Sequence, residues 1–207
     1  HQSLIDSPIR VILPRHEQGG AFAAAGFARA TGKTGVCMAT SGPGATNLAT
    51  GVGCAYLDRS ALIAATTEQS DAMRHRVTQM NVDHQALFAP ITKWTVRADA
   101  DTLTSTLDRA VATACEEVPG PVHIGLPVDL NDRNTPRGGR LPDAKATTPP
   151  SATAIQAAAA LIRQARRPLI AVGLTAARLG RHQSLAHLLD VIPADRKSGS
   201  AGMPRPS

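Results

Sequence analysis

Short apolar segments alternate with helix-like segments along residues 1–133, and this alternation limits the fold more than any other feature. The apolar segments are four to six residues long, as buried strands are. Alternating strands and helices predict an α/β fold, a parallel sheet with helices on both faces. We expect strands at 10–13, 36–39, 61–66, 91–96 and 121–126, helices at 17–31, 45–57 and 101–118, and a polar loop at 67–83.

The remaining residues predict a second, incomplete part. Residues 134–150 are rich in Pro, Gly and charge and are typical of a linker. Residues 151–194 read as the truncated start of a second α/β domain, too short to bury its own core. The tail, 195–207, has no periodicity and is expected to be disordered or non-native. Ser151 is the expected N-cap of a helix at 152–165, followed by a strand at 168–173 and a helix at 178–189.

Composition excludes several classes of protein. Residues 1–133 carry 11 Lys and Arg against 13 Asp and Glu, whereas 134–207 carry 11 against three. The basic part has no aromatic residue, so we expect no nucleic-acid partner. No apolar run approaches the roughly 20 residues of a membrane span, and no signal peptide is evident. The first residue is His1, not Met, so we expect the start of the parent protein to be missing. Three cysteines without a CxxC spacing indicate a reducing, cytoplasmic location and three buried core residues.

Two strand ends carry polar motifs. Ligands of such sheets bind where strands end, which points at the loops after Leu13, Ala39 and Thr66. The first loop reads Arg15-His16-Glu17-Gln18, and a helix follows directly. The second is the junction Thr40-Ser41-Gly42-Pro43-Gly44-Ala45-Thr46-Asn47, whose glycines would let a ligand approach the backbone. Taken alone, Glu17 could simply be a favourable charge in a first helical turn.

Together these motifs resemble the signature of thiamine-diphosphate enzymes of the acetolactate synthase type. The resemblance includes Gly26-Phe27-Ala28-Arg29-Ala30-Thr31-Gly32-Lys33 between the two motifs. It continues through Ile91-Thr92-Lys93-Trp94 and a closing segment, Pro119-Gly120-Pro121-Val122 with Leu126-Pro127-Val128-Asp129. It implies that 1–133 is a pyrimidine-binding domain and that 151–194 begins the family's central domain.

The resemblance also implies a mechanism. Glu17 would be the catalytic glutamate, hydrogen-bonded to the aminopyrimidine ring so that the cofactor can lose its C2 proton and attack a 2-keto acid. Ser41, Pro43, Gly44 and Asn47 would bind the cofactor's ring with Glu17. The implied reaction is decarboxylation followed by carboligation.

Half of the implied site is absent from this sequence. In the family, a GDG…N sequence in another domain binds Mg²⁺ and the diphosphate, and no GDG occurs here. The family's site is shared between subunits, so the resemblance implies a homo-oligomer, a dimer or tetramer, and a fragment that is inactive alone. FAD binds the central domain of some family members, which leaves flavin binding open.

One residue departs from the family pattern. Acetolactate synthases read Thr-Gly-Gln after the third strand, whereas this chain reads Thr66-Thr67-Glu68-Gln69. Glu68 is therefore a candidate residue on the substrate side, where its charge would oppose substrate carboxylates and favour a related decarboxylase or lyase. The alternative is a Glu68 that faces solvent.

The remaining polar residues indicate no further chemistry. His75 and His84 have no metal-ligand spacing and are expected to be solvated loop residues, so we expect no metal ligand. Ser41 lacks the surroundings of a hydrolase nucleophile. A second functional hypothesis remains, a catalytically silent binding or interaction module of the same fold.

Overall fold

The computed structural model describes residues 4, 7–132, 149–166, 168–178 and 182–192. The chain divides into two compact units between Lys145 and Ala146, and each unit is described by itself. This division falls inside the predicted linker. The exact domain bounds 1–133, 134–150, 151–194 and 195–207 stay predictions.

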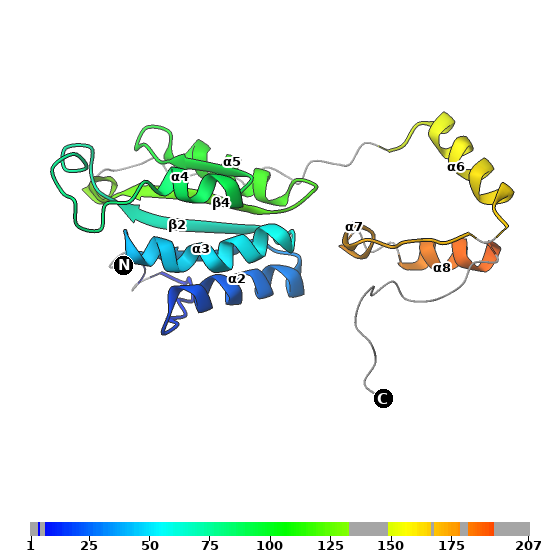
Figure 1. Ribbon diagram of the computed structural model, residues 1–207, viewed down its shortest axis with the longest axis horizontal. Helices are drawn as coiled ribbons and strands as arrows, with labels where there is room; N and C mark the ends of the chain where they lie inside the picture. The colour runs from blue at the N-terminus through cyan, green and yellow to red at the C-terminus, as the bar shows by residue number, and fades with distance from the viewer. Residues whose placement is uncertain (1–3, 5–6, 133–148, 167, 179–181, 193–207) are drawn as a thin grey trace. The chain divides into compact units, whose positions relative to one another are not determined.

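The first unit is a four-stranded parallel sheet in the order β1-β2-β4-β3. Helices α2 and α3 cover one face, and α5 covers the other (Figure 1). The predicted α/β fold with a parallel sheet and helices on both faces is therefore confirmed.

The strands are β1 (Gly35–Ala39), β2 (Leu62–Glu68), β3 (Trp94–Arg97) and β4 (Pro121–Pro127). The helices are α2 (Glu17–Thr31), α3 (Pro43–Leu57), α4 (His84–Phe88) and α5 (Leu103–Cys115). Short 3-10 helices span η1 (Ala89–Ile91) and η2 (Val128–Asp132).

The core divides along the sheet because successive strand residues point to opposite faces. Leu62 and Ala64 of β2 pack with the side chains of α2 and α3, while Ile63 packs on the α5 side. Small residues let α2 and α3 approach closely. A Cβ at Gly51 would lie 2.5 Å from the Cβ of Ala21, so only glycine fits this crossing.

Helix α2 has the bounds that the sequence predicts, and both ends are capped. The His16 ring nitrogen Nδ1 accepts a hydrogen bond from the backbone N–H of Gln18 at 3.2 Å. This contact gives His16 a local role, fixing the loop that precedes Glu17. At the other end Gly32 adopts φ 70° and donates its N–H to the Ala28 carbonyl, as a glycine C-cap does.

The strand predicted at 10–13 is wrong. Ile12 and Leu13 are 68% and 84% exposed, and these residues form no strand. Within the described chain β1 pairs only with β2, so this segment has no neighbour with which to share strand hydrogen bonds. Apolar β-branched residues alone do not make a strand.

Other differences concern the edges of elements. Helix α3 begins at Pro43, two residues before the prediction, because proline suits a first helical turn. Strand β2 continues to Glu68, and β3 begins only at Trp94, after a 3-10 helix. Helix α4 begins directly after the predicted loop, and the loop's last residue, Asp83, is its N-cap. Helix α5 (Leu103–Cys115) is shorter than the helix predicted at 101–118.

The second unit contains helices α6 (Ala152–Gln164), α7 (Leu174–Arg178) and α8 (His182–Val191). Ser151 caps α6, as predicted, by accepting the Ala154 N–H at 3.2 Å. The strand predicted at 168–173 is wrong, since no sheet forms among the described residues of this unit. The helix predicted at 178–189 corresponds in part to α8. The tail at 195–207 and most of the linker lie outside the described residues. No helix in the described ranges is both long and apolar enough to span a membrane.

Candidate functional site

Glu17 and Asn47 meet where the N-terminal ends of two helices lie side by side. Glu17 is the first residue of α2, and Asn47 lies in the first turns of α3. The Asn47 side chain donates a hydrogen bond from Nδ2 to Oε2 of Glu17 at 3.1 Å. Both side chains are half-buried. The two predicted motifs, some 25 residues apart in sequence, are therefore adjacent in space.

The surroundings of Glu17 favour its charged form. A backbone hydrogen bond is the main cause that lowers the pKa of the Glu17 carboxyl below its usual value, and the Asn47 hydrogen bond adds to it. Partial desolvation opposes these effects, and His16 reinforces them weakly. The position in a first helical turn is likewise favourable for an anion. The carboxylate keeps further acceptor capacity, because each oxygen can accept more than one hydrogen bond.

The glycine turn before α3 is packed against the protein itself. Gly42 has φ 60°, which favours glycine, and a Cβ there would lie 2.7 Å from the Cα of Met80. A Cβ at Gly44 would lie 2.7 Å from Cγ2 of Thr40. This packing gives both glycines a local structural role, and the approach of a ligand to their backbone stays a prediction. In this structure the space beside them is taken by Met80 and Thr40.

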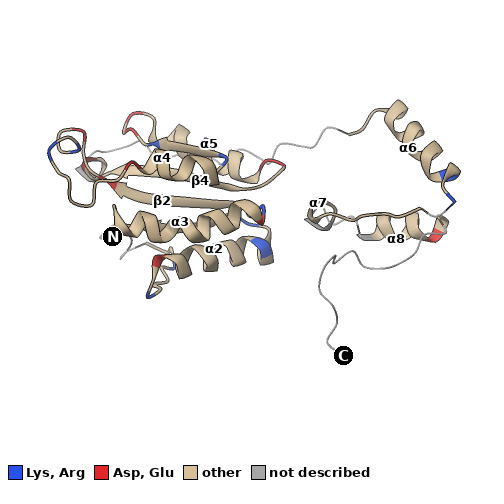
Figure 2. Cartoon of the chain, viewed as in Figure 1, with Lys and Arg blue, Asp and Glu red and all other residues tan. Residues whose placement is uncertain are grey.

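A cleft lies at the carboxyl end of the sheet, between the glycine turn and the loop after β2. Its wall includes Ser41, Glu68, Gln69, His84 and Gln85. Figure 2 shows charged residues of both signs in the loop at this end. Of the predicted cofactor-binding residues, only Ser41 lines this cleft. Glu17 and Asn47 form a separate contact, and the roles assigned to Glu17, Ser41, Pro43, Gly44 and Asn47 stay predictions.

Glu68 is held firmly in the wall of this cleft. It is only 9% exposed, so the alternative of a solvated loop residue is wrong. Gln85 donates from Nε2 to Oε1 at 2.7 Å, and Nε of Arg97 lies 3.2 Å from Oε2. Arg97 also contacts the exposed Asp71 through Nη2 at 3.1 Å. Glu68 therefore has a defined position and a cationic partner.

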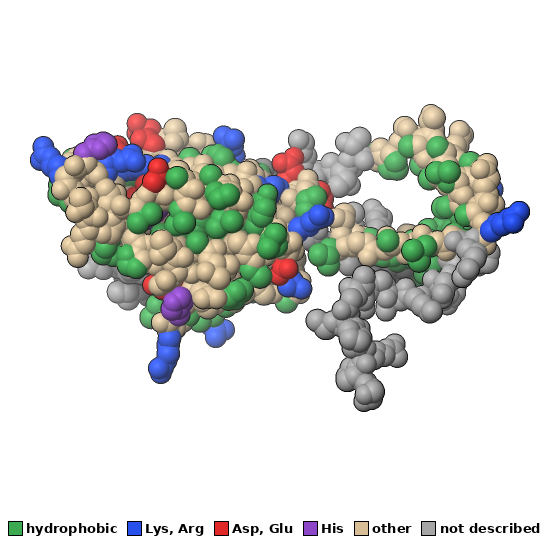
Figure 3. Space-filling model, in the orientation of Figure 1, with side chains coloured by type: hydrophobic (Ala, Val, Ile, Leu, Met, Phe, Trp, Pro, Cys, Tyr) green, Lys and Arg blue, Asp and Glu red, His purple; other side chains and the backbone are tan. Residues whose placement is uncertain are grey.

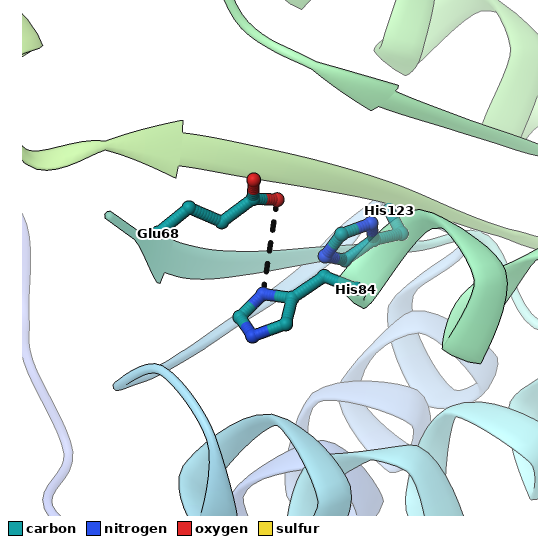
Figure 4. Close-up of side chains that lie close together, drawn as sticks. All are labelled: Glu68, His84 and His123. Carbon is teal, nitrogen blue, oxygen red and sulfur yellow. Dashed lines mark ion pairs between the residues drawn. The ribbon is translucent and has the colours of Figure 1, made fainter. Parts of the chain in front are cut away.

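Two buried histidines, His84 and His123, lie close to Glu68 (Figure 4). His84 is 1% exposed, contrary to the expected solvated loop residue, while His75 is exposed as predicted. Nδ1 of His84 lies 3.7 Å from Oε1 of Glu68. His123 of β4 is fully buried, and sequence analysis did not single it out. Two signals in the sequence could have indicated these buried histidines. Asp83 is a possible N-cap and caps α4 through the Ala86 N–H, and His123 is a polar residue inside an apolar strand.

The three cysteines differ in burial. Cys37 is buried, as expected, and burial raises the pKa of its thiol to about 12. Cys54 and Cys115 are only half-buried, which corrects the expectation of three core residues. All three are free thiols.

Comparison with known proteins identifies the domain. Residues 2–87 match the family described as thiamine pyrophosphate enzyme, N-terminal TPP binding domain. This match places residues 2–87 in the thiamine pyrophosphate enzyme family. The matched residues include both motifs and Glu68. They all lie in the first unit, where the signature motifs predicted the resemblance.

Relatives of this family extend over most of the chain. A probable acetolactate synthase large subunit of Methanocaldococcus jannaschii is 38% identical over 93% of the chain and 34% of its own length. A chloroplastic acetolactate synthase of Arabidopsis thaliana is 36% identical over 84% of the chain and 27% of its own length. A probable 2-ketoarginine decarboxylase of Pseudomonas aeruginosa is 35% identical over 98% of the chain and 37% of its own length. The chain thus spans about a third of the length of these relatives.

Proposed function

We propose that the full-length protein carrying this sequence is a thiamine-diphosphate enzyme that acts on a 2-keto acid by decarboxylation and carboligation. In this proposal Glu17 is the catalytic carboxylate that contacts the cofactor's aminopyrimidine ring. Ser41, Pro43, Gly44 and Asn47 contribute to the same pocket. The observation that carries the proposal is the hydrogen bond from Asn47 to Glu17, which joins the two motifs at adjacent helix N-termini.

The donor set fits the proposed cofactor. A ring nitrogen that gains a proton is stabilised by a neighbouring carboxylate, and the lowered pKa of Glu17 keeps that group anionic at neutral pH. Asn47 fixes one carboxylate oxygen and leaves acceptor capacity for a ligand. When bound, thiamine diphosphate supplies the electron sink for the substrate's carbanion. The protein's task is to orient that ring and stabilise its protonated form.

The proposal assigns the remaining components to the rest of the protein. Mg²⁺ and the diphosphate are held by a domain outside this chain, and FAD is a candidate ligand of the central domain. A homo-oligomer is supported by exposed apolar side chains on α2 and α3, including Phe22, Phe27 and Leu57. Apolar side chains also gather on the face of the first unit seen in Figure 3. Three free thiols are consistent with a cytoplasmic location.

A second candidate reaction is favoured by Glu68. The Glu68 carboxylate in the cleft wall is paired with Arg97, and a substrate with a cationic end would bind this carboxylate in competition with Arg97. One relative is named as a probable 2-ketoarginine decarboxylase, whose substrate name implies a guanidinium group. This candidate is a decarboxylase or lyase rather than a synthase. Comparing kcat/KM for pyruvate and for a guanidino 2-keto acid separates the two.

The experiment for the proposed function is turnover by the full-length protein with and without thiamine diphosphate and Mg²⁺. We expect product from a 2-keto acid only when both are present. The 207-residue chain alone should release no carbon dioxide from pyruvate, because it lacks the GDG sequence. A full-length protein that binds no cofactor and turns over no 2-keto acid would instead be the silent module.

A further inference from the structure

A chain of four polar side chains runs through the sheet behind Glu68. Oγ1 of Thr66 lies 2.8 Å from Nδ1 of His84 and 2.8 Å from Nε2 of His123. On its other side, Nδ1 of His123 lies 2.8 Å from Oγ1 of Thr95. These residues come from β2, α4, β4 and β3. Thr66 and His123 are fully buried, so hydrogen bonds within the chain must satisfy their polar atoms.

Burial favours the neutral form of both rings at neutral pH. Burial lowers the pKa of His123 to about 3, with a smaller contribution from His84. Burial also lowers the pKa of His84, although Glu68 and Asp83 oppose this shift. A neutral imidazole has one N–H donor and one acceptor nitrogen, and each threonine hydroxyl donates one hydrogen. The shared hydroxyl of Thr66 therefore allows two self-consistent directions of donation.

Glu68 selects one of these directions. Its Oε1 lies 3.7 Å from Nδ1 of His84, and the dashed line in Figure 4 joins these groups. A lone pair on Nδ1 would face the negative oxygen, whereas an N–H there is attracted to it. With a hydrogen on Nδ1, His84 donates to Thr66, and Thr66 donates to Nε2 of His123. The hydrogen of His123 is then on Nδ1 and is donated to Thr95.

The position of Glu68 is fixed from several sides. Gln85 and Arg97 hold its two oxygens, and Gly125 of the adjacent strand leaves space for the carboxylate. A Cβ at Gly125 would overlap Oε1 of Glu68 and lie 2.8 Å from Nε2 of Gln85. Because β2 and β4 are paired in register here, this space is built into the sheet.

We propose that His84, Thr66, His123 and Thr95 form a hydrogen-bond chain of one direction, and that the nearby Glu68 carboxylate sets this direction by fixing the tautomers of the two histidines. The carboxylate that sets this direction is itself held in the cleft wall by Gln85 and paired with Arg97. This inference does not depend on the proposed reaction, because it concerns the protein alone.

A metal ion is the competing explanation of the same cluster. One ligand atom from each of Glu68, His84 and His123 lies within 4.8 Å of the others. The hydroxyl of Thr66 already bonds both ring nitrogens, and Arg97 balances the charge of Glu68. A metal ion would have to displace the Thr66 hydroxyl from the ring nitrogens and bind close to the positive charge of Arg97. The geometry therefore favours the hydrogen-bonded chain.

Nitrogen-15 NMR of the 207-residue chain at pH 7 tests the inference, since protonated and unprotonated ring nitrogens resonate in separate ranges. We expect both His84 and His123 to carry hydrogen on Nδ1. Hydrogen on Nε2 of either ring in the wild type would overturn the inference. This measurement requires only the wild-type chain. The proposal is also overturned if one equivalent of Zn²⁺ shifts both rings together, because the cluster would then be a metal site.

Two variants sharpen the test. Glu68→Gln removes the charge that sets the direction, and we expect the Nε2-protonated forms to gain about tenfold in population, because the electrostatic attraction of Oε1 for an N–H on Nδ1 of His84 is lost. Asp71→Asn is the matched control, because Asp71 also pairs with Arg97 but lies 82% exposed and outside the chain. Unchanged tautomers in Glu68→Gln, or equal shifts in both variants, would contradict the role of Glu68.

Discussion

Two carboxylates, Glu17 at the start of α2 and Glu68 at the end of β2, are supported in opposite ways. Glu17 is half-buried at a helix N-terminus and accepts a side-chain hydrogen bond from Asn47. Glu68 is 9% exposed and is held by Gln85 and Arg97, with His84 3.7 Å from its Oε1. The lightly held carboxylate belongs to the recognisable family motif, and the firmly held one departs from it.

The difference separates two kinds of task. A carboxylate that must bond to a cofactor needs acceptor capacity left over, which the surroundings of Glu17 leave available. A carboxylate that shapes a cleft needs a fixed position, and such a position requires partners and space from several elements. We therefore expect substitutions around Glu68 to affect folding, and substitutions around Glu17 to affect chemistry.

Gly125→Ala gives the largest expected loss of stability. The added methyl group overlaps the buried Glu68 carboxylate, and overpacking of this kind costs about 3 kcal/mol in free energy of unfolding. Urea denaturation followed by the fluorescence of Trp94, the single tryptophan, measures it. Gly26→Ala is the control, because no atom lies within 4 Å of a Cβ there and alanine favours a helix. Equal stabilities of the two variants would show that Gly125 does not accommodate Glu68.

Thr66→Val tests the buried chain at its centre. Valine keeps the shape of threonine but leaves one nitrogen of His84 and one of His123 without a partner. We expect a loss of about 2 kcal/mol, the scale of unsatisfied buried groups. Thr66→Ser retains the hydroxyl and should lose clearly less. If serine and valine were equally destabilising, the hydroxyl would not be the important group.

Acidification should also destabilise the first unit through His123. The pKa of this ring is about 3 when folded against 6.5 for an unburied histidine, so below pH 6.5 the unfolded state binds a proton that the folded state rejects. The contribution of neutral His123 to the free energy of unfolding is fully present above pH 6.5 and is lost as the pH falls toward 3. The loss is about 2 kcal/mol at pH 5. His123→Asn should flatten this slope, while His75→Asn in the exposed loop should not. Parallel slopes in all three proteins would contradict the assignment.

Asn47→Ala should change stability least, by less than about 1 kcal/mol, because the bond that it removes is partly solvated. The pKa of Glu17 should rise, since the Asn47 hydrogen bond is one cause of its lowered value. Carbon-13 NMR titration of the Glu17 carboxyl measures this change. A large loss of stability with an unchanged pKa would mean that Asn47 supports the fold rather than the carboxylate.

Local signals made much of the fold predictable. Helix α2 has both predicted ends because a side-chain cap and a left-handed Gly32 act within a few residues. The buried strands β2 and β4 were found because continuous apolar runs are typical of a parallel sheet. The strand expected at 10–13 failed because strand formation also requires a neighbour, which a local pattern cannot supply.

The residues around Glu17 and those around Glu68 also differed in how far local sequence predicts them. Glu17 and Asn47 could be linked through a motif with a fixed spacing. The surroundings of Glu68 could not, because His84 and Gln85 of α4, Arg97 of β3 and His123 of β4 come from three separate elements that meet only when the sheet forms. His84 was misread because α4 is only five residues long and carries little periodic signal.

The most direct test of the central claim is hydrogen–deuterium exchange at C2 of saturating thiamine diphosphate in the full-length protein. The measurement compares wild type, Glu17→Gln and Glu68→Gln. Glutamine keeps the size of Glu17 but cannot stabilise a protonated ring nitrogen by charge, so we predict exchange and kcat about 10²-fold or more slower. Exchange in Glu68→Gln should stay near the wild-type rate. Equal exchange in wild type and Glu17→Gln would show that Glu17 is only a helix-terminal charge and would contradict the account.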